Sequence, residues 1–192
     1  MRKASVGIDR RLVLAGGGAA LLIPSAAQAA PANALPPQPD AASRLTEERA
    51  AAAREGKHVL ISFFASWCGW CTPMNAVFED NAVRPILERH YRLVHMRVIE
   101  RSVARRAQQW ANADAVYHRF ATAGDGLPFL VILDANGSLL SSSRSPAINE
   151  NIGFPTTPAD FTWFDTMFRT GAPDLSTDDL AVVRASFVRH YG

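Results

Sequence analysis

The two cysteines of the chain, Cys68 and Cys71, stand three residues apart directly after a short apolar run, residues 58–65. The run is rich in β-branched and aromatic residues, which is typical of a buried strand. Pro73 follows the second cysteine, and proline is accepted in the first turn of a helix because its missing N–H has no partner there. The segment therefore predicts a strand, a sharp turn, and a helix over about residues 69–81 with both cysteines in its first turn.

Two cysteines at this spacing can act as a redox pair. In the first turn of a helix their Cα atoms lie about 5–6 Å apart, which is within the range that a disulfide requires. Unpaired N–H groups and the positive end of the helix dipole stabilise a thiolate on Cys68, whereas Cys71 lies a turn deeper and should be less exposed. The pattern predicts Cys68 as the thiol that attacks a substrate disulfide and Cys71 as the thiol that resolves the mixed disulfide. This chemistry needs no organic cofactor and no metal.

Other uses of a cysteine pair compete with this interpretation. A zinc site would need further ligands, and neither a second cysteine pair nor suitably spaced histidines provide them. Haem attachment would need a histidine directly after Cys71, where the chain has Thr72. A structural disulfide over three residues would hardly constrain the unfolded chain. Copper(I) binding by the two thiols, with help from Met74 or Met96, is the strongest alternative, and a scaffold that binds partners without redox turnover is another.

Residues 1–29 predict a cleavable export signal. They start with basic residues, continue with an apolar run over residues 12–24, and end in small residues, with cleavage expected after Ala29. Arg10 and Arg11 resemble the twin-arginine export motif, and a general secretory signal fits equally well. The apolar run is too short to span a bilayer comfortably, although an uncleaved signal would serve as an anchor. Residues 30–42 are rich in proline and predict an extended tether. The expected location is therefore the periplasm.

The formal charge of the chain depends on that signal. The whole chain carries +2 and residues 1–29 carry +3, so the remainder carries −1. A broad basic surface is the electrostatic signature of nucleic-acid binding, and the remainder has no such excess of charge. We therefore expect no nucleic-acid partner.

The folded part, residues 43–192, shows alternating signals for strands and helices. Pro85 interrupts the helix after the cysteines, which otherwise continues toward residue 90. Further helices are expected over about 41–56, 102–121, 158–170 and 176–191, and further strands over 91–100, 127–134 and a hairpin after residues 135–137. This order predicts an α/β fold with a central mixed sheet flanked by helices and with extra C-terminal helices.

Two segments resemble the landmarks of the thioredoxin superfamily. FFASWCGWC, residues 63–71, resembles its active-site segment, and GLPFLVILDANG, residues 126–137, resembles the segment in which a cis-proline opens a strand that ends in a hairpin. The resemblance covers most of residues 45–145 and implies a thioredoxin-like fold. It also implies that Pro128 is cis and lies against the cysteines, while the backbone of Leu127 faces an extended substrate.

The residues around the cysteines complete the candidate site. Trp67, Gly69 and Trp70 flank or separate the two thiols, and with Leu127 and Pro128 they are the candidate substrate-binding residues. Each tryptophan also fits a simpler description, as a large and partly exposed residue beside the turn.

Beyond the cysteines the chain resembles a subgroup, the exported thioredoxin-like proteins related to the soluble domain of the transmembrane disulfide reductase. The resemblance is carried by Phe78, Asp80, Val83, Leu87, Tyr91 and Val94. It implies a thiol–disulfide oxidoreductase that acts on protein thiols and disulfides, with reduction favoured over oxidation. It also implies a membrane protein as electron donor or acceptor.

Two positions depart from the thioredoxin pattern. Ser62 stands where thioredoxins have a buried aspartate that accepts the proton of the second thiol, and Trp70 stands where they have proline. Because a hydroxyl cannot act as a carboxylate base, the proton acceptor for Cys71 is not identified by the resemblance. Arg97 and Glu100, on the expected neighbouring strand, are candidates for a contribution.

Overall fold

The structure, a computed structural model, describes residues 38–191. The predicted export signal and most of the predicted tether lie outside the described residues. The helices are α1 (Ala41–Glu55), α2 (Cys71–Glu79), α3 (Arg84–His90), α4 (Val103–Arg106), α5 (Ala113–Tyr117), α6 (Pro158–Gly171) and α7 (Thr177–His190). The strands are β1 (His58–Phe64), β2 (Tyr91–Arg97), β3 (Phe129–Leu133), β4 (Leu139–Ser142), β5 (Arg144–Ser145) and β6 (Glu150–Asn151). No helix in this part of the chain is long and apolar enough to cross a membrane.

A four-stranded mixed sheet with the order β2-β1-β3-β4 forms the centre of the fold. β1 is parallel to β2 and antiparallel to β3, and β3 pairs antiparallel with β4. Every residue of β3 is buried, because helices cover both faces of the sheet. The predicted α/β fold with a mixed sheet is confirmed.

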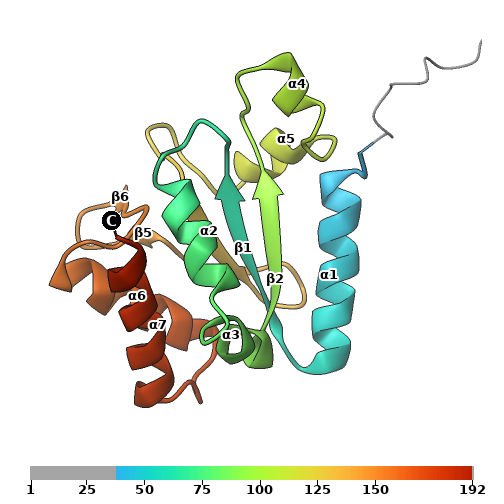
Figure 1. Cartoon of the computed structure of the whole chain (residues 1–192). Coiled ribbons are helices and arrows are strands. Elements are labelled where there is room, and N and C mark those ends of the chain that lie inside the picture. The colour runs from blue at the N-terminus through green and yellow to red at the C-terminus, as the bar shows by residue number, and fades with distance from the viewer. Residues whose placement is uncertain (1–37, 192) are drawn as a thin grey trace, which may run out of the picture. The chain divides into compact units, whose positions relative to one another are not determined.

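The alternation of side chains along the strands separates two apolar clusters, one on each face of the sheet. Leu60 and Ile132 pair across β1 and β3 and pack with α2, α3, α6 and α7, whereas Ile61 and Val131 pack with α1 and α5. Figure 1 shows α1 on one side of the strands and α2, α6 and α7 on the other. The redox loop, which we define as residues 65–70, leaves the end of β1 and enters α2 between these two layers.

The segment over residues 102–121 is not the single helix that its sequence predicts. It forms two short helices, and Asn112 between them has a left-handed backbone with φ 61°. Ala111 forms a β-bridge with Asp40, and the amide of Asn112 donates a hydrogen bond to the Asp40 carboxylate at 2.7 Å. In a continuous helix the backbone groups of Ala111 would form helical hydrogen bonds instead of this bridge. Contacts with the start of α1 therefore override the local helix propensity.

The C-terminal helices complete the layer that contains α2. α6 starts with a capping box between Thr157 and Asp160. It ends at Gly171, where an added Cβ would lie 2.7 Å from the Ile132 side chain, so only glycine permits this close approach to the sheet. The predicted helical extension is therefore packed on the sheet through a large apolar cluster.

One carboxylate joins α7 to the end of α2. Asp80 is the C-cap residue of α2. Its carboxylate accepts a hydrogen bond from Ser186 Oγ at 2.6 Å and forms an ion pair with Arg189, and His190 Nε2 lies 3.8 Å from it. The hydrogen bond from Ser186, together with those from Ala82 N–H and Arg189, holds the pKa of Asp80 well below its ordinary value. The last turn of α7 is thus held against the helix that starts at Cys71.

Candidate redox site

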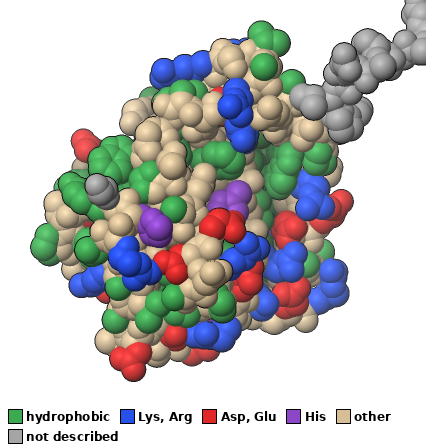
Figure 2. All heavy atoms as spheres, viewed as in Figure 1, with side chains coloured by type: hydrophobic (Ala, Val, Ile, Leu, Met, Phe, Trp, Pro, Cys, Tyr) green, Lys and Arg blue, Asp and Glu red, His purple; other side chains and the backbone are tan. Residues whose placement is uncertain are grey.

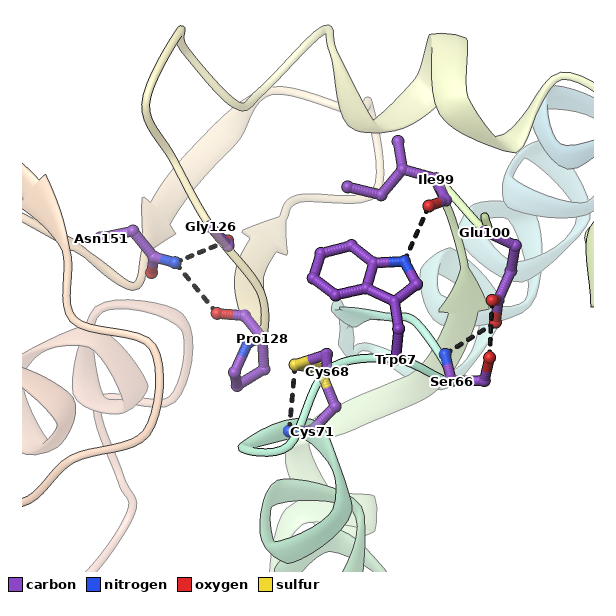
Figure 3. The surroundings of a disulfide bond; sticks show 9 residues. All are labelled: Ser66, Trp67, Cys68, Cys71, Ile99, Glu100, Gly126, Pro128 and Asn151. Carbon is purple, nitrogen blue, oxygen red and sulfur yellow. Dashed lines mark hydrogen bonds between the residues drawn. A yellow bond between two sulfur atoms is a disulfide. The ribbon is translucent and has the colours of Figure 1, made fainter. Parts of the chain in front are cut away.

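The two cysteines form a disulfide at the point where the redox loop becomes α2. Their Cα atoms are 5.3 Å apart, and Cys71 N–H donates to Cys68 Sγ at 3.2 Å. Cys71 is the first residue of α2, whereas Cys68 precedes the helix by three residues. Cys68 is 7% exposed and Cys71 is 2% exposed, so Cys68 is the more accessible of the two sulfurs. The lower exposure of Cys71 is what the sequence predicts. Figure 3 shows the two cysteines at the point where the loop meets α2.

Glu100 anchors the redox loop immediately before Cys68. Its buried carboxylate accepts hydrogen bonds from both Ser66 N–H and Ser66 Oγ at 2.7 Å, and Arg97 Nη1 lies 3.0 Å from it. Burial alone would raise the pKa of Glu100, but the hydrogen bonds from Ser66 and the nearby guanidinium outweigh it and hold the pKa below its ordinary value. The sequence raised Glu100 as a candidate proton acceptor for Cys71, and the structure instead places its carboxylate on the loop backbone (Figure 3).

Trp67 lies on the Cys68 side of the loop and is 38% exposed. Its Nε1–H donates to the carbonyl of Ile99 at 2.9 Å, and the Arg101 guanidinium lies 3.9 Å from the ring centroid. Ile99 has φ 43°, a conformation that is strained for a β-branched residue, and its N–H is held by Asp114 Oδ1 at 2.6 Å. The strained backbone therefore holds the carbonyl that fixes the indole next to Cys68.

Trp70 lies on the Cys71 side of the loop and is 48% exposed. Its ring stacks on Phe154 and Tyr191, with centroid distances of 5.5 and 5.8 Å. Gly69, between the cysteines, has open space where a Cβ would be. The loop that precedes α6 and the residue that follows α7 thus both reach the redox loop, a contact that the sequence did not predict.

The Leu127–Pro128 peptide bond is cis, which agrees with the expectation from the resemblance. Pro128 is buried, and Leu127 packs against the small cluster formed by Ala65, Cys68 and Cys71. Asn151 on β6 donates from Nδ2 to the carbonyls of Gly126 and Pro128 at 2.8 and 3.0 Å. Figure 3 shows Pro128 facing Cys68 from the side opposite Trp67. Asn151 is a positioning residue that the sequence reasoning missed, because nothing local marks it.

Ser62 lies in the middle of β1 and is buried, and its Oγ has no hydrogen-bond partner within residues 38–191. A neutral, buried hydroxyl therefore stands at the position in β1 where thioredoxins have a buried aspartate.

The described residues contain no group of three or more histidine, cysteine, aspartate or glutamate side chains arranged to hold a metal ion. Met74 and Met96, the thioethers considered for copper(I), belong to the two large apolar clusters, whereas Cys68 and Cys71 pack with Ala65, Phe64 and Leu127. Nothing in this part of the molecule adds a third soft ligand to the cysteine pair.

A βαβ unit with a cysteine pair at the start of its helix and a cis-proline beside it defines a protein of the thioredoxin fold. A model of the thioredoxin-like family matches residues 40–135, which is half of the chain, and the chain belongs to this family. The family and the close-set cysteine pair together identify a thioredoxin-like oxidoreductase.

Several solved structures are similar to this chain. A disulphide isomerase from Xylella fastidiosa Temecula1 is 17% identical, with 90% of this chain and 100% of that chain covered and a TM-score of 0.45. The DsbD C-terminal domain of Neisseria meningitidis in the oxidised form is 17% identical, with 69% and 99% covered and a TM-score of 0.43. The DsbH oxidoreductase is 18% identical, with 74% and 92% covered and a TM-score of 0.44. No curated protein gives a significant match.

Proposed function

We propose that this protein is an exported thiol–disulfide oxidoreductase that exchanges protein disulfides through Cys68 and Cys71. The observation that carries the proposal is the disulfide at the start of α2, with the more exposed sulfur on the N-terminal side and Pro128 facing it. A purely structural link of this length would add little stability, because it closes only a three-residue loop.

The exchange balances with the two thiols alone. In the reduced protein, the Cys68 thiolate attacks one sulfur of a substrate disulfide, the substrate S–S bond breaks, and the departing thiolate takes up a proton. The Cys71 thiolate then attacks Cys68 Sγ, which releases the second substrate thiol and forms the Cys68–Cys71 disulfide. Two electrons pass to the substrate. A second protein dithiol must return them to Cys68 and Cys71, and the reverse sequence delivers a disulfide to a substrate.

The surroundings of the disulfide support an extended polypeptide as the substrate. Leu127 packs against the cluster that contains the cysteines. The backbone of a residue in this position can form hydrogen bonds with an extended substrate that lies beside it like an added strand. Trp67, Gly69 and Trp70 form the exposed surface on both sides of the sulfurs and would contact the same segment. These four positions, together with Pro128, form the proposed substrate site.

Export and electron supply belong to the same proposal. The signal expected in residues 1–29 would deliver the protein to the periplasm, where both disulfide oxidation and disulfide reduction occur. Reduction is the direction that we favour, and the electron donor would be a membrane protein with its own thiols. Support comes from the export pattern and from the resemblance to exported thioredoxin-like proteins.

The test is a redox titration of the Cys68–Cys71 pair in glutathione buffers, read by alkylation and mass spectrometry. A potential near that of thioredoxin, about −270 mV, supports a reductase, and a potential near about −120 mV supports a disulfide donor. The Cys68→Ser variant is the control and should show no two-electron transition. A pair that does not cycle between dithiol and disulfide in these buffers would refute the proposal.

A further inference from the structure

The segment next to Trp67 carries a concentration of positive charge that the redox chemistry does not use. Residues 101–106, which we call the arginine segment, include Arg101, Arg105 and Arg106, and all six residues are exposed. The chain from residue 30 onward carries −1 in total, so this short segment departs strongly from the average charge. Figure 2 shows basic side chains at the top of the view, where Figure 1 places α4.

The arginine side chains in this segment lack the carboxylate partners found elsewhere. Arg84, Arg92 and Arg189 each form an ion pair with a carboxylate. Within residues 38–191, by contrast, no ion pair involves Arg101, Arg105 or Arg106. Arg106 donates to the backbone carbonyls of Glu100 and Arg101, and Arg105 donates to Gln108 Oε1, but these acceptors are neutral. The positive charge of the segment is therefore not balanced by a carboxylate and is available to a partner.

The acidic residues nearest in the sequence do not neutralise the arginine segment, because their carboxylates are used inside the fold. Glu100 accepts from Ser66 and pairs with Arg97. Asp114 Oδ1 accepts from Ile99 N–H at 2.6 Å and from Gln109 Nε2 at 3.0 Å. The Asp114 carboxylate fixes the backbone that leads into the arginine segment, the Glu100 carboxylate is held by Ser66 and Arg97, and the segment itself contains no acidic residue.

The position of the segment ties it to the redox site. Arg101 lies 3.9 Å from the centroid of the Trp67 ring, and Trp67 is the residue directly before Cys68. An extended chain advances about 3.3 Å per residue. A polypeptide whose cysteine lies at Cys68 and whose chain passes over Trp67 would therefore bring residues about two to four positions away into reach of Arg101.

We infer that the protein selects substrate or partner polypeptides with acidic residues close to the reacting cysteine, and that the arginine segment binds those residues. This inference rests on the proposed function and names the partner class for the same site. Exposed complementary charges chiefly raise the association rate, and the effect falls with added salt because the Debye length shortens. The preference should thus be found in the second-order rate constant and should depend on ionic strength.

The experiment measures a single turnover, so that no recycling reductant is needed. The reduced full-length protein is mixed with a peptide whose one cysteine is linked by a disulfide to a chromophoric thiol, and release of that thiol is followed by stopped flow. Three peptides differ only in having glutamate, glutamine or lysine on both sides of the cysteine. Each rate constant is divided by that for dithiothreitol with the same peptide, which removes the effect of the flanking charges on the disulfide itself.

At about 20 mM salt we expect the glutamate peptide to react about tenfold faster than the lysine peptide, and at about 500 mM salt we expect the difference to be largely lost. The double variant Arg101→Glu/Arg105→Glu should abolish or reverse the preference. The matched control is Arg54→Glu/Arg169→Glu. Arg54 lies in the last turn of α1, next to Glu55, which pairs with Arg92 at the start of β2. Arg169 follows Phe168, whose carbonyl accepts a hydrogen bond from Tyr91, also at the start of β2. The start of β2 is at the end of the sheet away from Cys68. The control should keep the preference.

The outcomes separate this inference from the proposed function. If none of the three peptides reacts, the proposed function fails. If the glutamine peptide reacts but glutamate and lysine peptides do so equally at low salt, the function stands and the inference is wrong. The inference is also wrong if the double variant keeps the preference. It is equally wrong if the three peptides react alike while vesicles of anionic lipid retain the wild-type protein and release the double variant, because the arginine segment would then be a membrane-binding surface.

Discussion

The two sides of the redox loop are held by different kinds of interaction. On the Cys68 side, polar groups fix the backbone: Glu100 binds Ser66, and the carbonyl of Ile99 binds Trp67. On the Cys71 side, aromatic rings pack: Trp70 stacks with both Phe154 and Tyr191. Directional hydrogen bonds define a position more narrowly than apolar packing does. Cys68, which we propose as the attacking sulfur, therefore lies beside the part of the loop that hydrogen bonds hold, and Cys71 lies beside the part that aromatic packing holds.

The largest effect should follow from removing the polar support. Glu100→Ala leaves Ser66 N–H and Arg97 without their buried carboxylate, and loss of one member of such a network should lower the free energy of unfolding by about 3 kcal/mol. Glu100→Gln keeps an acceptor for Ser66 and should lose less. Urea unfolding of the oxidised protein measures both values. Equal stability of wild type and Glu100→Ala would show that the carboxylate does not hold the loop.

Acid should weaken the same support. Because the pKa of Glu100 is lowered in the folded state, its charge stabilises the protein above the ordinary pKa of about 4.5, and this stabilisation is lost as the pH falls through the folded-state value. The difference in unfolding free energy between wild type and Glu100→Gln should therefore be constant near neutral pH and should narrow below about pH 4.5. A difference that widens in acid would mean that the pKa of Glu100 is raised instead.

Removing the aromatic support should have a smaller effect. Tyr191→Ala removes one ring from the stack on Trp70, and a single aromatic pair contributes about 1 kcal/mol. Tyr191→Phe keeps the ring and serves as the control. Both variants are compared by urea unfolding and by the rate of the first exchange step. We expect a small loss of stability for alanine alone and an unchanged rate of attack by Cys68. A large fall in that rate would contradict the separation of the two sides.

The smallest effect is expected at Ser62, which lies in β1, the strand that leads into the redox loop. Its buried hydroxyl has no partner among the described residues, so Ser62→Ala should stabilise the protein by up to about 1 kcal/mol. Thermal unfolding measures this change. Rapid-quench analysis of mixed-disulfide decay tests whether the resolving step by Cys71 is affected. Slower decay in the variant would show that Ser62 takes part in proton transfer.

The centre of the site could be predicted from sequence because its signals are local. The run before Cys68, the turn and the helix after it lie within a short segment. The cis bond at Pro128 and its position beside the cysteines were implied instead by the family resemblance. The supports could not be predicted, because each joins residues far apart. Glu100 and Ser66 are 34 positions apart, and Tyr191 meets Trp70 from the far end of the chain. Where such a contact competes with local propensity, as at Asn112, the local prediction of one helix was wrong.

The most direct test of the central claim identifies which sulfur attacks. The Cys71→Ser variant is mixed with a protein that contains one accessible disulfide, and the products are mapped by mass spectrometry after alkylation. Because Cys68 is the more exposed sulfur and Cys71 is the proposed resolving thiol, we expect a stable mixed disulfide on Cys68. The Cys68→Ser variant should form no such adduct at a comparable rate. Trapping through Cys71 in that variant, or no adduct on Cys68 in the first, would contradict the account.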